Sequence, residues 1–148
     1  MILGVGTDMA SIDRIFTVLG RHGDRFKERC FAKEERERVE KSSSDEQAAA
    51  GGYAKRWAAK EACAKALGLG IRENIYLRDI VVLNDENGKP RLELRGGAKE
   101  RLTSLTPEGM NSRIHLSLSD EFPMAIAFVV ISAVTGDNDD GVEKWMPR

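Results

Sequence analysis

The stretch RWAAKEACAKALGLG, residues 56–70, constrains the fold more than any other segment, because it has a helical pattern with almost no bulky side chains. We expect a helix over about residues 53–67 that ends at Gly68, since glycine commonly follows a helix end. Small side chains allow another backbone to approach closely, so the segment predicts tight packing against a neighbouring element. The apolar arc of this helix consists of Ala58, Ala59, Ala62, Cys63, Ala66 and Leu67.

Glu61 and Lys65 lie one turn apart on a different face of the same helix, together with Trp57. A glutamate followed by a lysine four residues later is commonly a surface pair that stabilises a helix by roughly 0.3 kcal/mol. A tightly packed helix would also hold the two side chains in fixed positions, as a functional site requires. The spacing alone leaves both interpretations open.

The N-terminal stretch MILGVGTD alternates in the manner of a β-strand. Gly4, Gly6 and Asp8 fall on one side of this strand, and Leu3 and Val5 fall on the other. Glycines inside a strand often mark a close approach by another element. We therefore expect a neighbour to pack directly on the side that carries the glycines and the aspartate.

Asp8 and Glu61 would stand on two separate rigid elements. Two such carboxylates suit a hard divalent cation such as Mg²⁺, whose remaining positions are filled by water and phosphate oxygens. Lys65 beside them would be a partner for a phosphate group. The combination indicates phosphate chemistry, although two acids far apart in sequence are weak evidence by themselves.

The remaining pattern predicts an α+β fold, a single compact domain whose mainly antiparallel sheet packs on the alanine-rich helix. We expect residues 1–134 to form this domain and residues 135–148 to form a mobile acidic tail. Before the alanine-rich helix, we expect a helix capped by Ser11 with Ile12, Ile15, Phe16 and Leu19 on one face, a turn and short helix over 20–31, a charged helix over 32–42 and a loop over 42–52. After it, we expect a hairpin that turns at Asn87-Gly88 and a helix over 98–105. The last expected elements are a strand over 113–119 and a buried central strand over 124–134.

Composition excludes several function classes. The 148 residues carry 23 basic and 24 acidic side chains, a net charge of −1, which gives no case for binding nucleic acid or a membrane surface. No stretch approaches the roughly 20 apolar residues of a membrane span, and the N-terminus lacks the pattern of a signal peptide. Cys30 and Cys63 do not form a metal-ligand pattern. These features together favour a reducing, cytoplasmic location.

Four motifs in order, GVGTDMASIDRI, RWAAKEACAKALGLGI, NGKP and HLSLSD, resemble the holo-[acyl-carrier-protein] synthases of the 4′-phosphopantetheinyl transferase superfamily. The resemblance covers nearly all of residues 1–134. The first two motifs are highly specific at this separation, whereas NGKP is also an ordinary hairpin turn.

The resemblance implies an enzyme that moves the 4′-phosphopantetheine arm of coenzyme A to a serine of an apo acyl carrier protein. The reaction releases adenosine 3′,5′-bisphosphate and supports the synthesis of fatty acids or related lipids. By resemblance, Asp8 and Glu61 hold Mg²⁺ and Lys65 contacts a coenzyme A phosphate, so these three residues are the expected catalytic group. His115 and Ser117 match the strand motif that lines the coenzyme A cleft, and the best-known members are homotrimers with active sites between subunits.

Other details are less specific. Lys89 and Pro90 could approach the adenosine 3′-phosphate, but a solvated turn lysine fits equally well. Asp120 stands where many family members have histidine or threonine, so that part of the cleft is expected to differ. The acceptor of the serine proton is left open between Glu61 and a metal-bound water.

The segment from Arg14 to Arg29 carries five basic residues against two acidic ones. Such a segment is usually a solvated helix face. Acyl carrier proteins, however, are small and acidic, and a local basic patch would attract them. Given the resemblance, we expect Arg14, Arg21 and Arg25 to dock the carrier protein.

Two other functions fit the same residues. One is a Mg²⁺-dependent nucleotide hydrolase that uses Asp8 and Glu61 and has no protein acceptor. The other is an oligomeric module that binds a carrier protein without chemistry, in which Glu61 and Lys65 form only a surface pair. The fate of coenzyme A and of the carrier distinguishes these alternatives from group transfer.

Overall fold

The computed structural model describes residues 1–68 and 75–136. Its elements, in chain order, are β1 (Ile2–Ser11), α1 (Ile12–Cys30), α2 (Lys33–Ser42), α3 (Glu46–Ala66), the short 3-10 helix η1 (Leu77–Asp79), β2 (Ile80–Asn84), β3 (Pro90–Leu94), α4 (Gly96–Leu105), β4 (Met110–Glu121) and β5 (Met124–Thr135). The predicted α+β fold with a mainly antiparallel sheet is confirmed.

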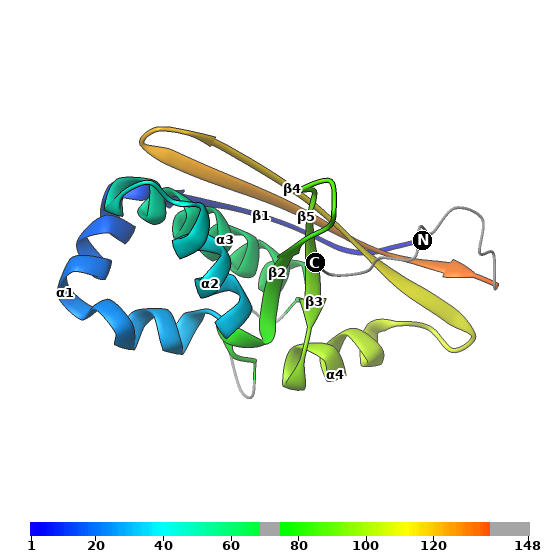
Figure 1. Ribbon diagram of the computed structural model, residues 1–148. Coiled ribbons are helices and arrows are strands. Elements are labelled where there is room, and N and C mark those ends of the chain that lie inside the picture. The colour runs from blue at the N-terminus through cyan, green and yellow to red at the C-terminus, as the bar shows by residue number, and fades with distance from the viewer. Residues whose placement is uncertain (69–74, 137–148) are drawn as a thin grey trace.

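Strands β1, β5 and β4 form a three-stranded antiparallel sheet in that order, so the apolar strand β5 is central, as predicted. Strands β2 and β3 form a separate antiparallel hairpin. The alanine-rich helix α3 runs along one face of the three-stranded sheet, and α1 and α2 pack around α3 (Figure 1). We call the face that contacts α3 the inner face and the opposite one the outer face.

The contact between α3 and β1 explains both the glycines and the alanines. A Cβ atom on Gly4 would lie 1.9 Å from the carbonyl oxygen of Ala66, and one on Gly6 would lie 1.8 Å from that of Ala62. Real Cβ atoms do not approach so closely, so only glycine fits at both positions. The close approach expected at the glycine-bearing side of the strand is therefore made by the alanine-rich helix itself.

Helix α3 begins earlier than predicted, and the loop expected over 42–52 is wrong from Glu46 onward. Asp45 caps the helix, because its side chain accepts a hydrogen bond from the Ala48 amide at 2.8 Å. Gly52 lies inside the helix, where an added Cβ atom would be 3.1 Å from Cγ1 of Val39. One of the small residues that suggested a loop, Gly52, thus allows Val39 of α2 to pack on α3.

Helix α1 contains a break at Gly23, whose φ of 38° is in the region that favours glycine. The turn predicted within residues 20–31 is present at this glycine, and helical structure resumes as far as Cys30. Ile12 and Ile15 are buried against the core, whereas Phe16 remains 39% exposed. The predicted apolar face of α1 is therefore only partly covered.

Two further predictions from the sequence concern the C-terminal tail and membrane-spanning segments. Strand β5 continues to Thr135, and residues 137–148 of the expected tail lie outside the described residues. Within residues 1–68 and 75–136, no helix combines the length and the apolar character needed to cross a bilayer.

Candidate active site

The contact between β1 and α3 brings together three of the predicted site residues. Nζ of Lys65 donates a hydrogen bond to Oδ1 of Asp8 at 3.1 Å and to the carbonyl oxygen of Thr7 at 2.8 Å. The Asp8 side chain is 18% exposed and that of Lys65 is 53% exposed. Lys65 can reach the strand because the neighbouring glycines and alanines let the two backbones approach.

Glu61 lies close enough to Asp8 for their charges to interact. Partial burial raises the pKa of Glu61, the negative charge of Asp8 raises it further, and the ammonium group of Lys65 opposes both effects. A cation between the two carboxylates would relieve this repulsion. Carboxylate oxygens are also the donors that Mg²⁺ prefers, so the pair fits the metal that the sequence predicts.

The carboxylate pair is not part of a larger metal cluster in the described residues. Across 1–68 and 75–136, no three histidine, cysteine, aspartate or glutamate side chains gather closely enough to hold a metal ion. A closed structural metal site is thus not formed there. Two carboxylates instead leave room for water and substrate oxygens around a bound ion, which is the usual arrangement for Mg²⁺ at phosphate sites.

His115 and Ser117 lie on the other face of the sheet. Asp8 pairs with Ala127 on β5, whereas His115 pairs with Val130, three residues further along that strand. Because successive side chains alternate between the two faces, His115 and Ser117 project from the outer face and Asp8 from the inner one. Within one chain, the sheet separates the two halves of the predicted site.

The β2–β3 turn presents Lys89 at the surface. Its backbone amide donates a hydrogen bond to Oδ1 of Asp85 at 2.9 Å, and Pro90 begins β3. No hydrogen bond or ion pair of the described residues joins this turn to Asp8, Glu61 or Lys65. Within the described residues, no polar contact therefore supports the phosphate role expected of Lys89 and Pro90.

Asp120, the departure from the family pattern, forms an ion pair with Lys55 of α3 at 3.6 Å. Both side chains are partly exposed. The acidic residue at the end of β4 therefore has a basic partner on the adjacent helix, which accounts locally for its presence.

The predicted docking residues lie on α1, and Arg14 is the one that lies near the candidate site. Arg14 lines a hollow of about 270 Å³ whose wall includes Trp57 of α3. Trp57 stands one turn before Glu61, so the hollow adjoins the candidate site. Arg14, Arg21 and Arg25 are exposed, and none of the ion pairs within 1–68 and 75–136 involves them.

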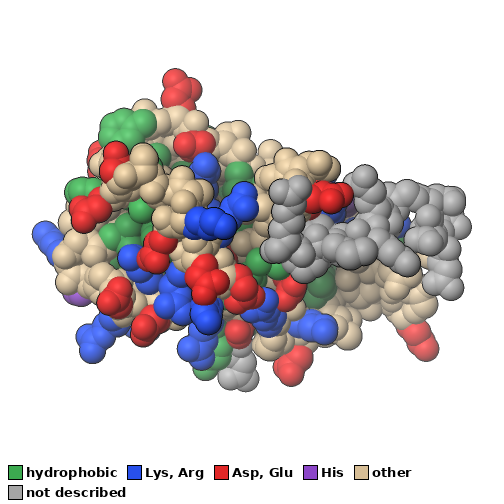
Figure 2. Space-filling view, in the orientation of Figure 1, with side chains coloured by type: hydrophobic (Ala, Val, Ile, Leu, Met, Phe, Trp, Pro, Cys, Tyr) green, Lys and Arg blue, Asp and Glu red, His purple; other side chains and the backbone are tan. Residues whose placement is uncertain are grey.

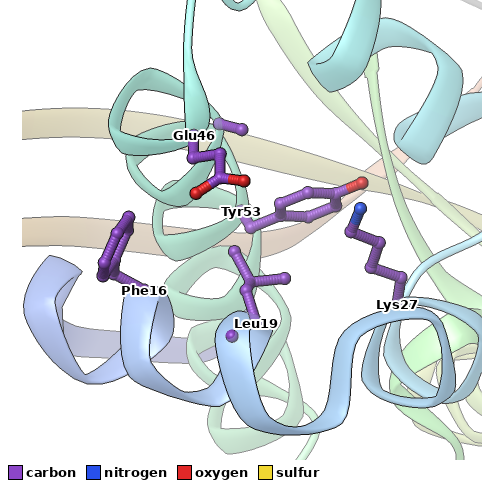
Figure 3. A pocket seen from close by; sticks show the side chains of 7 residues that line it. Phe16, Leu19, Lys27, Glu46 and Tyr53 are labelled. Carbon is purple, nitrogen blue, oxygen red and sulfur yellow. The ribbon is translucent and has the colours of Figure 1, made fainter.

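One basic residue of α1, Lys27, differs from the docking arginines because it has an ion-pair partner. Lys27 forms an ion pair with Glu40 at 2.9 Å and lies beside Tyr53, at a smaller hollow of about 140 Å³ between α1 and α3 (Figure 3). Basic and acidic side chains are interspersed over the side of the molecule that carries α1 and α2 (Figure 2). The positive charge available for docking is therefore confined to the arginines of α1 that are unpaired within the described residues, and it does not extend over the whole side of the molecule.

One charged residue of the helix motif was missed by the sequence interpretation. Lys60, directly before Glu61, is fully buried and forms an ion pair with the equally buried Glu35 at 2.7 Å. At 100° per residue Lys60 falls about 20° from Leu67, at the edge of the apolar arc, so the helical spacing itself indicated burial. Its burial depends on how α2 and the β2–β3 hairpin pack against α3.

Comparison with known proteins shows the family to which the chain belongs. Residues 4–127 match the family model of the 4′-phosphopantetheinyl transferase superfamily. The holo-[acyl-carrier-protein] synthase of Rhodopseudomonas palustris (strain TIE-1) is 53% identical over 134 residues, which cover 90% of this chain and 92% of that protein.

Solved structures give the same result. The crystal structure of holo-[acyl-carrier-protein] synthase from Neisseria meningitidis superposes with a TM-score of 0.73 at 36% identity and covers 89% of this chain and 99% of that one. The Helicobacter pylori synthase, solved in complex with coenzyme A, superposes with a TM-score of 0.71 at 28% identity, covering 86% and 99%. The chain therefore belongs to the 4′-phosphopantetheinyl transferase superfamily, among its holo-[acyl-carrier-protein] synthases.

Proposed function

We propose that the protein transfers 4′-phosphopantetheine from coenzyme A to a serine of an apo acyl carrier protein in a Mg²⁺-dependent reaction. The observation that carries this proposal is the meeting of Asp8, Glu61 and Lys65 at the contact between β1 and α3. Family membership supplies the reaction class. The product would serve the synthesis of fatty acids or related lipids in the cytoplasm, where the free thiols of Cys30 and Cys63 remain reduced.

The bond changes define what the residues must do. The serine oxygen attacks the β-phosphorus of coenzyme A, and the bond from that phosphorus to the bridging oxygen breaks, which releases adenosine 3′,5′-bisphosphate. Asp8 and Glu61 would hold the metal. When bound, Mg²⁺ supplies positive charge beside the pyrophosphate oxygens. Lys65, which contacts Asp8 without substrate, would turn its ammonium group toward a phosphate. The serine proton passes to Glu61 or to a water beside it.

We infer that the site is completed by a second copy of the chain. His115 and Ser117 project from the outer face, opposite Asp8, so one chain cannot bring the two halves together. The same face exposes large apolar side chains, which favours its burial against another protein surface. These are Val5, Met9, Ile126 and Phe128, which are 54%, 61%, 42% and 47% exposed. A homotrimer, as in the family, would cover this patch and pair the halves between neighbours.

The carrier protein is proposed to dock on α1. Arg14, Arg21 and Arg25 are exposed there without ion-pair partners among the described residues. The hollow that Arg14 and Trp57 line is mainly apolar, and Trp57 stands one helical turn before Glu61. An acidic helical partner would meet both charge and apolar surface beside the site of transfer.

One assay tests the reaction against its alternatives. The protein is incubated with coenzyme A, Mg²⁺ and an apo carrier protein, and the carrier is weighed by mass spectrometry. A gain of one phosphopantetheine supports transfer. Breakdown of coenzyme A with an unchanged carrier would indicate a hydrolase, and no change in either would indicate a binding module.

A further inference from the structure

The ammonium group of Lys60 lies at a fully buried junction of helices and strands. Lys60 and Glu35 are both 0% exposed. Nζ of Lys60 donates hydrogen bonds to Oε2 of Glu35 at 2.7 Å, to the carbonyl oxygen of Ile80 at 2.6 Å and to that of Leu77 at 3.0 Å. Its three donors are therefore all used, and they join α3 to α2, β2 and η1.

The carboxylate of Glu35 is equally well satisfied. Its Oε1 accepts a hydrogen bond from the Val82 amide at 3.0 Å, and its Oε2 accepts one from the Ala32 amide at 2.8 Å. Burying two charges is costly, and apolar residues of similar volume often give equal or greater stability. Net stability is therefore a weak reason for this pair. Its several directional hydrogen bonds suit it better to fixing a geometry.

On the sheet side of α3, the hydrogen bonds to Asp8 and to the Thr7 carbonyl come from one long, half-exposed side chain, that of Lys65. There Gly4 and Gly6 meet Ala62 and Ala66, residues with little or no side chain to interlock. This backbone contact sets how closely the helix approaches the strand, and it restrains the rotation of the helix about its own axis less than the three buried hydrogen bonds of Lys60 do. Rotation matters, because the carboxylate of Glu61 must stay on the side of Asp8.

Lys60 precedes Glu61 in sequence, so the two side chains leave the helix about 100° apart. A restraint on Lys60 therefore fixes the direction of Glu61. We propose that Lys60 and Glu35 form a positioning pair, which holds α3 at the rotation that keeps Glu61 beside Asp8. This inference rests on the proposed function to the extent that Asp8 and Glu61 are the metal-binding pair.

Four variants test the positioning pair. Lys60→Met removes the ammonium and leaves Glu35 buried without its cation. Glu35→Gln keeps a carbonyl oxygen for the Val82 or Ala32 amide, and the double variant Glu35→Gln/Lys60→Met removes both charges. Val39→Ala is the matched control, because it weakens the packing of α2 on α3 at Gly52 without changing a charge.

Two measurements are made on each folded variant. Calorimetry should give a Mg²⁺ dissociation constant at least about tenfold higher in the double variant than in Val39→Ala, the size of effect usual when a group that orients a metal ligand is lost. Hydrogen exchange of the amides of residues 61–66 should also be faster in the double variant than in a control of equal thermal stability. If the double variant does not fold, Glu35→Gln should show the same two changes.

The proposal is overturned if these variants match Val39→Ala in both Mg²⁺ affinity and amide exchange, since the pair would then contribute only to packing. Failure of the proposed function gives a different result. If the wild-type protein binds no Mg²⁺, the metal site is wrong. In that case, hydrogen exchange at the amides of residues 61–66 still shows whether Lys60 and Glu35 hold α3 at its rotation.

Discussion

The two faces of the three-stranded sheet use alternate residues of the same strand for different purposes. On the inner face, Gly4 and Gly6 admit the backbone of α3 and so place Asp8 beside Lys65. On the outer face, Val5 and Met9 are large, apolar and exposed. The inner face selects for small size because a helix must fit, and the outer face selects for apolar surface, as a protein interface would. The alternation of residues along β1 thus places site residues on one face of the sheet and the apolar surface of the proposed assembly on the other.

The largest expected effect comes from adding a single methyl group to the inner face. Gly6→Ala places a Cβ atom 1.8 Å from the carbonyl oxygen of Ala62, so strand and helix must separate. We expect the free energy of unfolding to fall by about 3 kcal/mol or more, the upper range for overpacking. Chemical denaturation measures it, and transfer activity should be lost with the contact.

A glycine elsewhere in α3 provides the control. Gly51 has no atom within 4 Å of an added Cβ, so Gly51→Ala should raise stability by about 0.5–1 kcal/mol through helix propensity. Equal stability of the Gly6 and Gly51 variants would contradict the role assigned to the inner face.

The next effect concerns the carboxylates that this contact positions. Asp8→Ala and Glu61→Ala should each lower the turnover number by about 100-fold or more, the range seen when a preorganised electrostatic contact to a transition state is removed. Both variants should remain folded, because neither side chain belongs to the apolar core. Turnover is measured across a Mg²⁺ titration with circular dichroism as the folding control. A wild-type rate in either variant would remove that residue from the site.

The sequence predicted the parts of this arrangement that depend on local pattern. The alternation in β1 and the alanines of α3 each indicated a close approach, and the apolar run of β5 indicated a central strand. The start of α3 was misplaced because Gly51 and Gly52 resemble a loop in sequence, whereas the structure uses Gly52 to admit Val39. Local propensity alone does not reveal that second, tertiary reason for a small residue.

The sequence also could not predict contacts between residues that are far apart in the chain. His115 and Asp8 could both be placed on strands, but which face each occupies depends on the register of β1 and β4 against β5. The burial of Lys60 likewise depends on Glu35 and on carbonyl oxygens that are distant in sequence. Spacing along one helix cannot indicate such partners.

A charge on the outer face tests its proposed role in assembly. Phe128→Asp leaves the inner face unchanged, because Phe128 is 47% exposed on the opposite side. We expect subunit association to weaken by about 2 kcal/mol, roughly thirtyfold, as for loss of an interface anchor. Light scattering across a dilution series measures this, with Thr103→Asp on the exposed side of α4 as the control. A monomeric wild-type protein with full activity would contradict the proposed assembly.

Mixing two variants examines whether the two faces meet between subunits. Asp8→Ala subunits retain the outer half of the site, and His115→Ala subunits retain the inner half. In an equal mixture that exchanges subunits, roughly one site in four should combine two intact halves and recover activity. No recovery after verified subunit exchange would place the whole site within one chain.

The smallest expected effect lies outside both faces, on α1. Reversing two charges there, with Arg14→Glu and Arg21→Glu, should act on the protein substrate alone. The apparent KM for the carrier should rise by at least about tenfold, since roughly 1.4 kcal/mol is a modest loss for two reversed charges at an interface. The KM for coenzyme A should stay nearly constant, because that ligand depends on Lys65 and on the carboxylates. Steady-state kinetics with each substrate varied in turn separates the two values.

Salt provides the accompanying control for this variant. Screening shortens the reach of exposed charges, so the wild-type KM for the carrier should climb with ionic strength. The variant should show a flatter dependence, because it has lost the attraction that salt weakens. If the carrier KM is unchanged at low salt in a folded variant that still binds coenzyme A, then Arg14 and Arg21 belong to a solvated helix face. The carrier would then have to dock on another surface.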